Sequence, residues 1–70
     1  MSREQAIEIA RQRLDFEAKS VEAVRATDEG RPVWRVTFRG EDIGPARPMG
    51  EVLIVLVDRK TGEVVSVGMS

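Results

Sequence analysis

The sequence predicts a small α+β domain in which one N-terminal helix packs on an antiparallel sheet of about four strands. Two observations predict this class. Apolar residues recur at helical spacing near the start of the chain, and the period then changes to the alternation typical of strands. Short turn signals also separate the strand segments, giving the order α-β-β-β-β with two hairpins. We expect one domain that covers residues 1–70.

The predicted helix begins after Ser2 and extends to about Leu14. Ser2 followed three residues later by Gln5 matches a capping box, in which each side chain bonds the other residue's backbone N–H. One stripe of the helix is apolar and is expected to face the sheet. Its members are Ala6, Ile7, Ala10 and Leu14.

The first predicted hairpin joins residues 21–27 to residues 33–39 through turn residues 28–32. In its second strand, Trp34, Val36 and Phe38 share one face, and we expect this face to pack beneath the helix. Residues 40–50 are rich in Gly and Pro and form a long predicted loop. Its length makes this loop a candidate binding loop or covering flap.

The second predicted hairpin joins residues 51–58 to residues 63–69. The first of these strands is apolar without interruption from Val52 to Val57, which is typical of a central strand covered on both faces. In the turn, Asp58 can accept hydrogen bonds from backbone N–H groups, and Gly62 can adopt a positive φ.

Residue types that commonly carry catalysis or bind metal are scarce. The chain has no His, Cys or Tyr, so it lacks the commonest general base, thiol nucleophiles, soft metal ligands and disulfides. Glu41 and Asp42 are adjacent acids in the predicted loop, and we interpret them as solvated rather than catalytic. We therefore expect no enzymatic activity, no metal and no cofactor.

Basic residues suggest an alternative, nucleic-acid-binding surface. Arg25, Arg35 and Arg39 could line the sheet face opposite the helix and contact anions. The overall charge of −1 gives no bulk attraction to phosphate, and the nearby aromatic residues are expected in the core. A solvated strand face is the simpler interpretation of these arginines.

A single helix covers only one side of a sheet, so part of the apolar surface should need another cover. We expect this candidate partner surface to lie on the last two strands and to be covered by a protein partner or by a second copy of the chain, as a homodimer. Its predicted members are Leu53, Val55, Val57, Val65, Val67 and Met69.

The chain shows no export or membrane signal in its sequence. The polar N-terminus does not resemble a signal peptide, and the longest apolar stretch is far shorter than the ~20 residues of a membrane helix. We expect a cytoplasmic location, unless these residues are part of a longer protein.

Three segments together resemble the PepSY domain. They are Ala6-Ile7-x-Ile9-Ala10-x-x-x-Leu14, Val33-Trp34-x-Val36-x-Phe38 and Val57-Asp58-x-x-Thr61-Gly62-Glu63-Val64-Val65. The resemblance implies a helix packed on an antiparallel sheet and a non-enzymatic module that binds and restrains peptidases or acts as a regulatory domain. It supplies no catalytic residues.

Three functions remain open from the sequence. The first is a protein-binding or regulatory module of the PepSY kind, acting through its sheet or through residues 40–50. The second is an immunity-type protein that neutralises one partner, because small proteins of that group have a similar Trp-x-Val strand and Asp-x-x-Thr-Gly hairpin. The third is a weak nucleic-acid-binding protein, which salt-dependent binding would distinguish from the other two.

Overall fold

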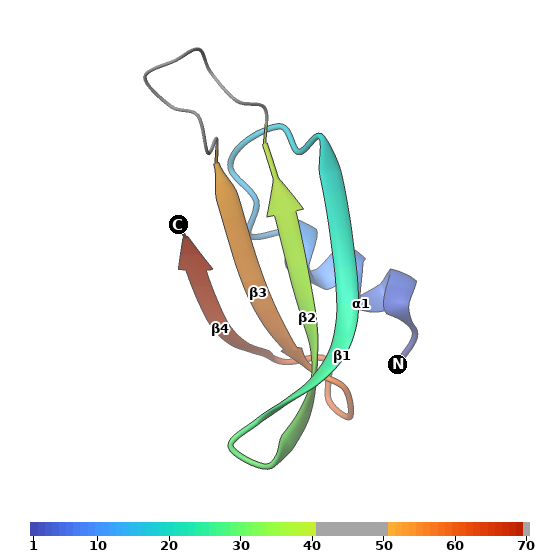
Figure 1. Cartoon of the computed structure of the whole chain (residues 1–70). Helices are drawn as coiled ribbons and strands as arrows, with labels where there is room; N and C mark the ends of the chain where they lie inside the picture. The colour runs from blue at the N-terminus through green and yellow to red at the C-terminus, as the bar shows by residue number, and fades with distance from the viewer. Residues whose placement is uncertain (41–50, 70) are drawn as a thin grey trace.

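A computed structural model shows one helix followed by a four-stranded antiparallel sheet in the order β1-β2-β3-β4 (Figure 1). The structure describes residues 1–40 and 51–69. Within these residues the helix lies behind the sheet in Figure 1, and the front face carries no second layer. The predicted α-β-β-β-β order and its two hairpins are confirmed. The elements are α1 Arg3–Arg11, β1 Ser20–Asp28, β2 Arg31–Arg39, β3 Val52–Asp58 and β4 Val64–Met69.

The capping box at the start of α1 is present as predicted. The Ser2 backbone N–H donates to Gln5 Oε1 at 2.9 Å, and the Gln5 N–H donates to Ser2 Oγ at 3.2 Å. The helix ends at Arg11, earlier than the predicted Leu14. After it, successive backbone N–H groups bond to carbonyls three residues back, as in Leu14 N to Arg11 O at 3.0 Å. This tighter bonding ends the regular helix, while Leu14 still packs against the core.

The first hairpin has a tighter turn than predicted. β1 and β2 pair as far as Asp28 and Arg31, which leaves Glu29 and Gly30 as the turn. Both residues have positive φ, 51° and 82°. Positive φ at both central residues is the geometry of a type I′ turn, whose twist matches that of the paired strands. The turn therefore fixes the register of the whole hairpin.

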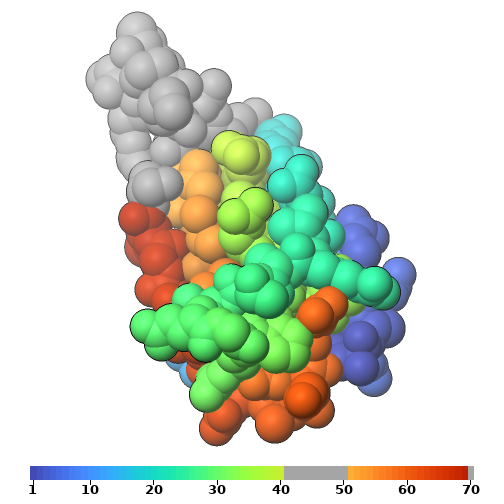
Figure 2. All heavy atoms as spheres, turned by 60° about the horizontal axis from the view of Figure 1, so that its bottom comes forward, coloured from blue at the N-terminus to red at the C-terminus, as the bar shows by residue number. Residues whose placement is uncertain are grey.

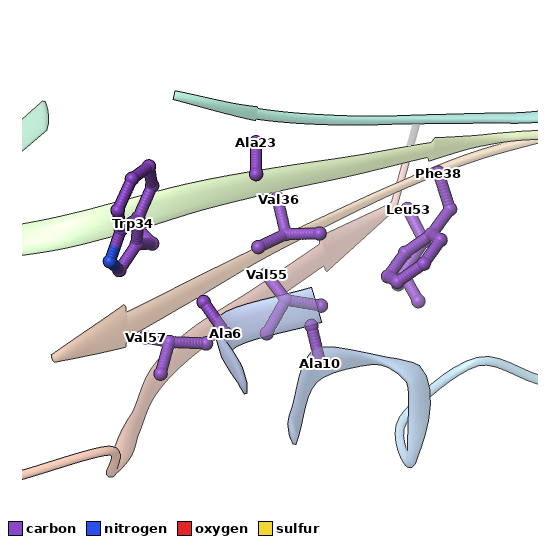
Figure 3. Close-up of a cluster of buried hydrophobic side chains, with 9 residues drawn as sticks. All are labelled: Ala6, Ala10, Ala23, Trp34, Val36, Phe38, Leu53, Val55 and Val57. Carbon is purple, nitrogen blue, oxygen red and sulfur yellow. The ribbon is translucent and has the colours of Figure 1, made fainter. Parts of the chain in front are cut away.

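The main core lies between α1 and the sheet, and Trp34, Val36 and Phe38 are part of it as predicted (Figure 3). Ala6 and Ala10 present no side chain beyond Cβ, so the helix approaches the strands closely. The main strand contacts of α1 are with β1, β2 and β3. Members of the core cluster are Ala6, Ala10, Ala23, Trp34, Val36, Phe38, Leu53, Val55 and Val57.

One prediction about β3 is corrected by this core. Leu53, Val55 and Val57 were expected on the uncovered face, but they are only 2%, 0% and 0% exposed and lie beneath α1. They pair with the core residues of β2, and directly opposite residues of antiparallel strands share a face. The three residues therefore form the core and offer no partner surface.

Candidate protein-binding edge of the sheet

β4 forms one edge of the sheet and carries exposed apolar side chains. Val67 and Met69 are 44% and 62% exposed. They pair with Val55 and Leu53 and so lie on the helix side of the sheet, beyond the strands that α1 chiefly contacts. Their predicted exposure is thus present in the structure, but on the helix side of the sheet and not on the predicted uncovered face. An exposed apolar edge strand is a template for pairing with another chain.

The turn before β4 holds that strand in position. Asp58 Oδ1 accepts hydrogen bonds from the backbone N–H groups of Lys60 at 2.7 Å and Thr61 at 3.0 Å. Gly62 has a φ of 78°, and its N–H donates to Asp58 O at 2.9 Å. Both predictions for this turn, the Asp58 contacts and the positive φ of Gly62, are confirmed.

These contacts also affect the ionisation of Asp58. The N–H donors of Thr61 and Lys60 lower the pKa of its carboxyl below the ordinary value, and the positive charge of Arg31 adds to this effect. Arg31 Nε lies 3.6 Å from Asp58 Oδ2. The ionised carboxylate therefore ties the turn to β2 as well as closing the hairpin.

A bulge separates the start of β4 from its exposed part. Val64 pairs with Val57, but Ser66 pairs with Leu56, so the register shifts and Val65 has no Cα partner on β3. Val65 is half-buried. The six residues predicted as one partner surface therefore divide into a buried set on β3, one bulge residue and the exposed pair Val67 and Met69.

The two edges of the sheet differ in chemistry. β4 contains no charged residue between Val64 and Met69. β1, the opposite edge, carries the charged residues Glu22, Arg25 and Asp28. Charged side chains on an edge strand disfavour pairing with another strand. β4 is therefore the edge that is open to strand addition.

The front face of the sheet is a second, weaker candidate surface. Its centre holds half-buried apolar residues, and Arg35 and Arg39 are exposed beside them on β2. Pairing across β1, β2 and β3 places these residues on the face away from α1. The apolar members are Val24, Ala26, Val52, Ile54 and Leu56.

The structure does not bring the three predicted anion-binding arginines together. Arg25 pairs with Trp34 and so lies on the helix side, with its Cζ 5.6 Å from the centre of the Trp34 ring. Arg35 and Arg39 occupy the opposite face. The sequence prediction failed because it assigned all of residues 28–32 to the turn. The observed turn contains only Glu29 and Gly30, and this register sets Arg25 opposite Trp34.

Other predicted features are tested only in part. The candidate loop lies almost wholly outside the described residues, as do Glu41 and Asp42. Within residues 1–40 and 51–69, no group of three or more His, Cys, Asp or Glu side chains is arranged to hold a metal ion. No helix in the same residues has the length and apolar character needed to cross a membrane.

The fold and the edge define a class of protein: a small α+β domain with a helix on one face of an open antiparallel sheet and one apolar edge. Comparison with known families identifies it further. The family model of PepSY, the peptidase propeptide and YPEB domain, matches residues 1–67. The chain belongs to the PepSY family, as its three sequence segments predicted. No curated protein and no solved structure matches it.

Proposed function

We propose that this chain is a non-enzymatic, protein-binding module that restrains a peptidase through β4. Membership of a family described by peptidase propeptides supports the class of partner. The absence of His, Cys and Tyr from the sequence supports a role in binding rather than in catalysis. The observation that carries the proposal is the uncharged edge strand with Val67 and Met69 exposed.

The binding mode follows from the geometry of an edge strand. An extended segment of the peptidase pairs with β4, so that main-chain hydrogen bonds provide affinity and alternate side chains provide specificity. Val67 and Met69 point to the same face because they are two residues apart. They pack against apolar side chains of the added segment, which shields them from water. Met is well suited to this contact because its flexible thioether adapts to different partners.

Inhibition of peptidases tests the proposal. Purified peptidases of the source cell are assayed on casein with and without the wild-type domain, the Val67→Lys variant or the Met69→Lys variant. We expect the wild-type domain to inhibit one of them and each variant to be about tenfold weaker or more, since a buried interface charge is costly.

Thr27→Lys is the matched control. Thr27 is an exposed residue of β1, so this variant adds the same charge to the edge of the sheet away from β4. It should retain inhibition within about twofold, because surface substitutions change free energies by about 0.5 kcal/mol or less. Equal losses in all three variants would contradict a contact through Val67 and Met69. Inhibition of no peptidase by a folded wild-type domain would contradict the function itself.

Two further expectations from the sequence remain untested. A homodimer, if it uses the same edge, competes with the peptidase and is detected by sedimentation. The cytoplasmic location stays a prediction, and imaging of the full-length natural protein tests it.

A further inference from the structure

A basic hollow lies at the end of the sheet where the turn after β3 meets β2. Its volume is about 290 Å³. Figure 2 shows this end of the molecule, with the orange turn residues between the green β1–β2 hairpin and the blue N-terminal residues. The lining residues are Met1, Arg25, Pro32, Trp34, Arg59 and Lys60.

Three positive side chains converge on this hollow from separate parts of the chain. Arg25 comes from β1, whereas Arg59 and Lys60 come from the turn. Within residues 1–40 and 51–69, none of the three forms a salt bridge, and the Asp58 carboxylate in the same turn pairs with Arg31. This local charge contrasts with the net charge of −1 for the whole chain. The hollow therefore has a positive potential set by its own lining.

Hydrogen bonds fix the backbone that carries these cations. The Arg59 N–H donates to Pro32 O at 3.1 Å and ties the turn to β2. The Lys60 N–H donates to Asp58 Oδ1, which fixes the next residue of the turn. Arg25 is held opposite Trp34 by strand register. The charged groups thus project from ordered segments, which lowers the entropy cost of binding a ligand.

Trp34 forms an aromatic wall of the hollow, and its indole N–H is buried. The residue is only 7% exposed, and its Nε1–H has no hydrogen-bond acceptor in the described part of the chain. Figure 3 shows the indole at one end of the core cluster, with its nitrogen turned away from Ala23 and toward the end of β3. Buried indole N–H groups usually have a partner. Because this nitrogen is itself shielded from solvent, a ligand in the hollow meets Trp34 through its ring carbons and not through this N–H.

We propose that the hollow binds the carboxylate of an acidic residue in a peptide segment of the protein partner. Guanidinium groups bind carboxylates through paired hydrogen bonds, and the Pro32 and Trp34 walls pack against the aliphatic part of a Glu or Asp side chain. A nucleic-acid strand would instead need cations spread along its backbone. The inference deepens the proposed function, and it rests on that function only in assigning the segment to a peptidase.

Trp34 supplies a direct assay because it is the single Trp of the chain. The intact chain is titrated with a short peptide containing two glutamates, with the same peptide containing glutamines, and with inorganic phosphate, while Trp34 fluorescence is recorded. The glutamate peptide should give a saturable change and bind more tightly than the other two. The Arg59→Gln/Lys60→Gln double variant should bind it about fivefold to twentyfold more weakly, since each exposed ion pair contributes a small factor.

The control is Arg35→Gln/Arg39→Gln, which removes the same charge from the opposite face. It should keep the affinity for the glutamate peptide within about twofold. No saturable change, equal binding of the glutamine peptide, tighter binding of phosphate, or equal losses in both double variants would each overturn the proposal. Peptidase inhibition distinguishes failure of the carboxylate site from failure of the proposed function. If the turn variants inhibit normally while Val67→Lys does not, the carboxylate site fails and the proposed function stands.

Discussion

Replacement of leucines on the two faces of β3 tests where the core lies. Leu53 is 2% exposed beneath α1, whereas Leu56 is half-buried on the front face. Leu→Ala removes three carbon atoms, which at about 0.8 kcal/mol each gives about 2.4 kcal/mol, and the cavity adds to this cost. We therefore expect Leu53→Ala to lower the free energy of unfolding by about 3 kcal/mol. Leu56→Ala, with part of its side chain in water, should lower it by about 1 kcal/mol.

Urea and thermal unfolding, followed by circular dichroism, measure these losses. In a domain of this size each kcal/mol lowers the Tm by about 4–8 °C, so Leu53→Ala should lose about 12–24 °C and Leu56→Ala about 4–8 °C. Total stabilities of about 3.5–10 kcal/mol are typical of 70 residues, so the milder pair Leu53→Val and Leu56→Val serves if the Ala variant of Leu53 does not fold. A loss for Leu56 equal to or greater than that for Leu53 would refute the assignment of the helix to the Leu53 face.

Three further predictions concern the turns and the edge. Gly30→Ala should lower the free energy of unfolding by about 1 kcal/mol in urea titrations, because φ is 82° although the added methyl group has open space. Asp58→Asn should flatten the acid-induced loss of stability, as measured by urea midpoints between about pH 2 and pH 7. Val67→Lys should shift any dimer toward monomer in sedimentation at high protein concentration.

The sign of the Asp58 effect follows from its lowered pKa. The ionised carboxylate stabilises the fold at pH values above its unfolded pKa, which is near 3.8, and this contribution is lost as the pH falls through the lower folded pKa. Identical acid profiles for the wild type and Asp58→Asn would contradict this role. For the turn, an unchanged stability of Gly30→Ala would contradict the type I′ geometry. For the edge, a dimer that persists in Val67→Lys would place self-association elsewhere.

Local signals in the sequence predicted most of the fold. Ser2 with Gln5, Trp34 with its alternate neighbours, and Asp58 with Gly62 each specify a structure through residues that are close in the chain. Such short-range patterns give the element order, both hairpins and one face of the core. The strands extend a residue or two beyond their predicted limits at the first turn because Glu29 adopts a positive φ. Nothing in the residue type of Glu29 indicates that conformation.

The faces of β3 and β4 could not be predicted in the same way. An uninterrupted apolar strand has no alternation, so its two faces look alike until its register with β2 is known. That register is set across the long segment of residues 40–50, where no short turn fixes it. The bulge at Val65 is a further shift that the sequence does not signal. Val67 and Met69 were therefore predicted correctly as exposed, but they and the three β3 residues lie on the helix side of the sheet and not on the predicted uncovered face.

The basic hollow depends on long-range placement. Arg25, Trp34 and Arg59 belong to three different segments and meet only when both hairpin registers are known. The predicted arginine set follows from strand alternation, which gives the face of each residue within one strand but not across strands. For Arg59 and Lys60 the sequence pattern indicates only a turn. A site whose residues are brought together by strand pairing can be located only in the structure.

Amide hydrogen exchange of the domain, alone and in complex with a peptidase identified by the inhibition assay, tests the central claim most directly. Strand addition gives unpaired N–H groups of the edge a hydrogen-bond partner and slows their exchange. We predict slower exchange along β4, Val64–Met69, and unchanged exchange along the charged edge β1, Ser20–Asp28. Protection confined to β1 or to α1, with β4 exchanging as in the free domain, would contradict the account.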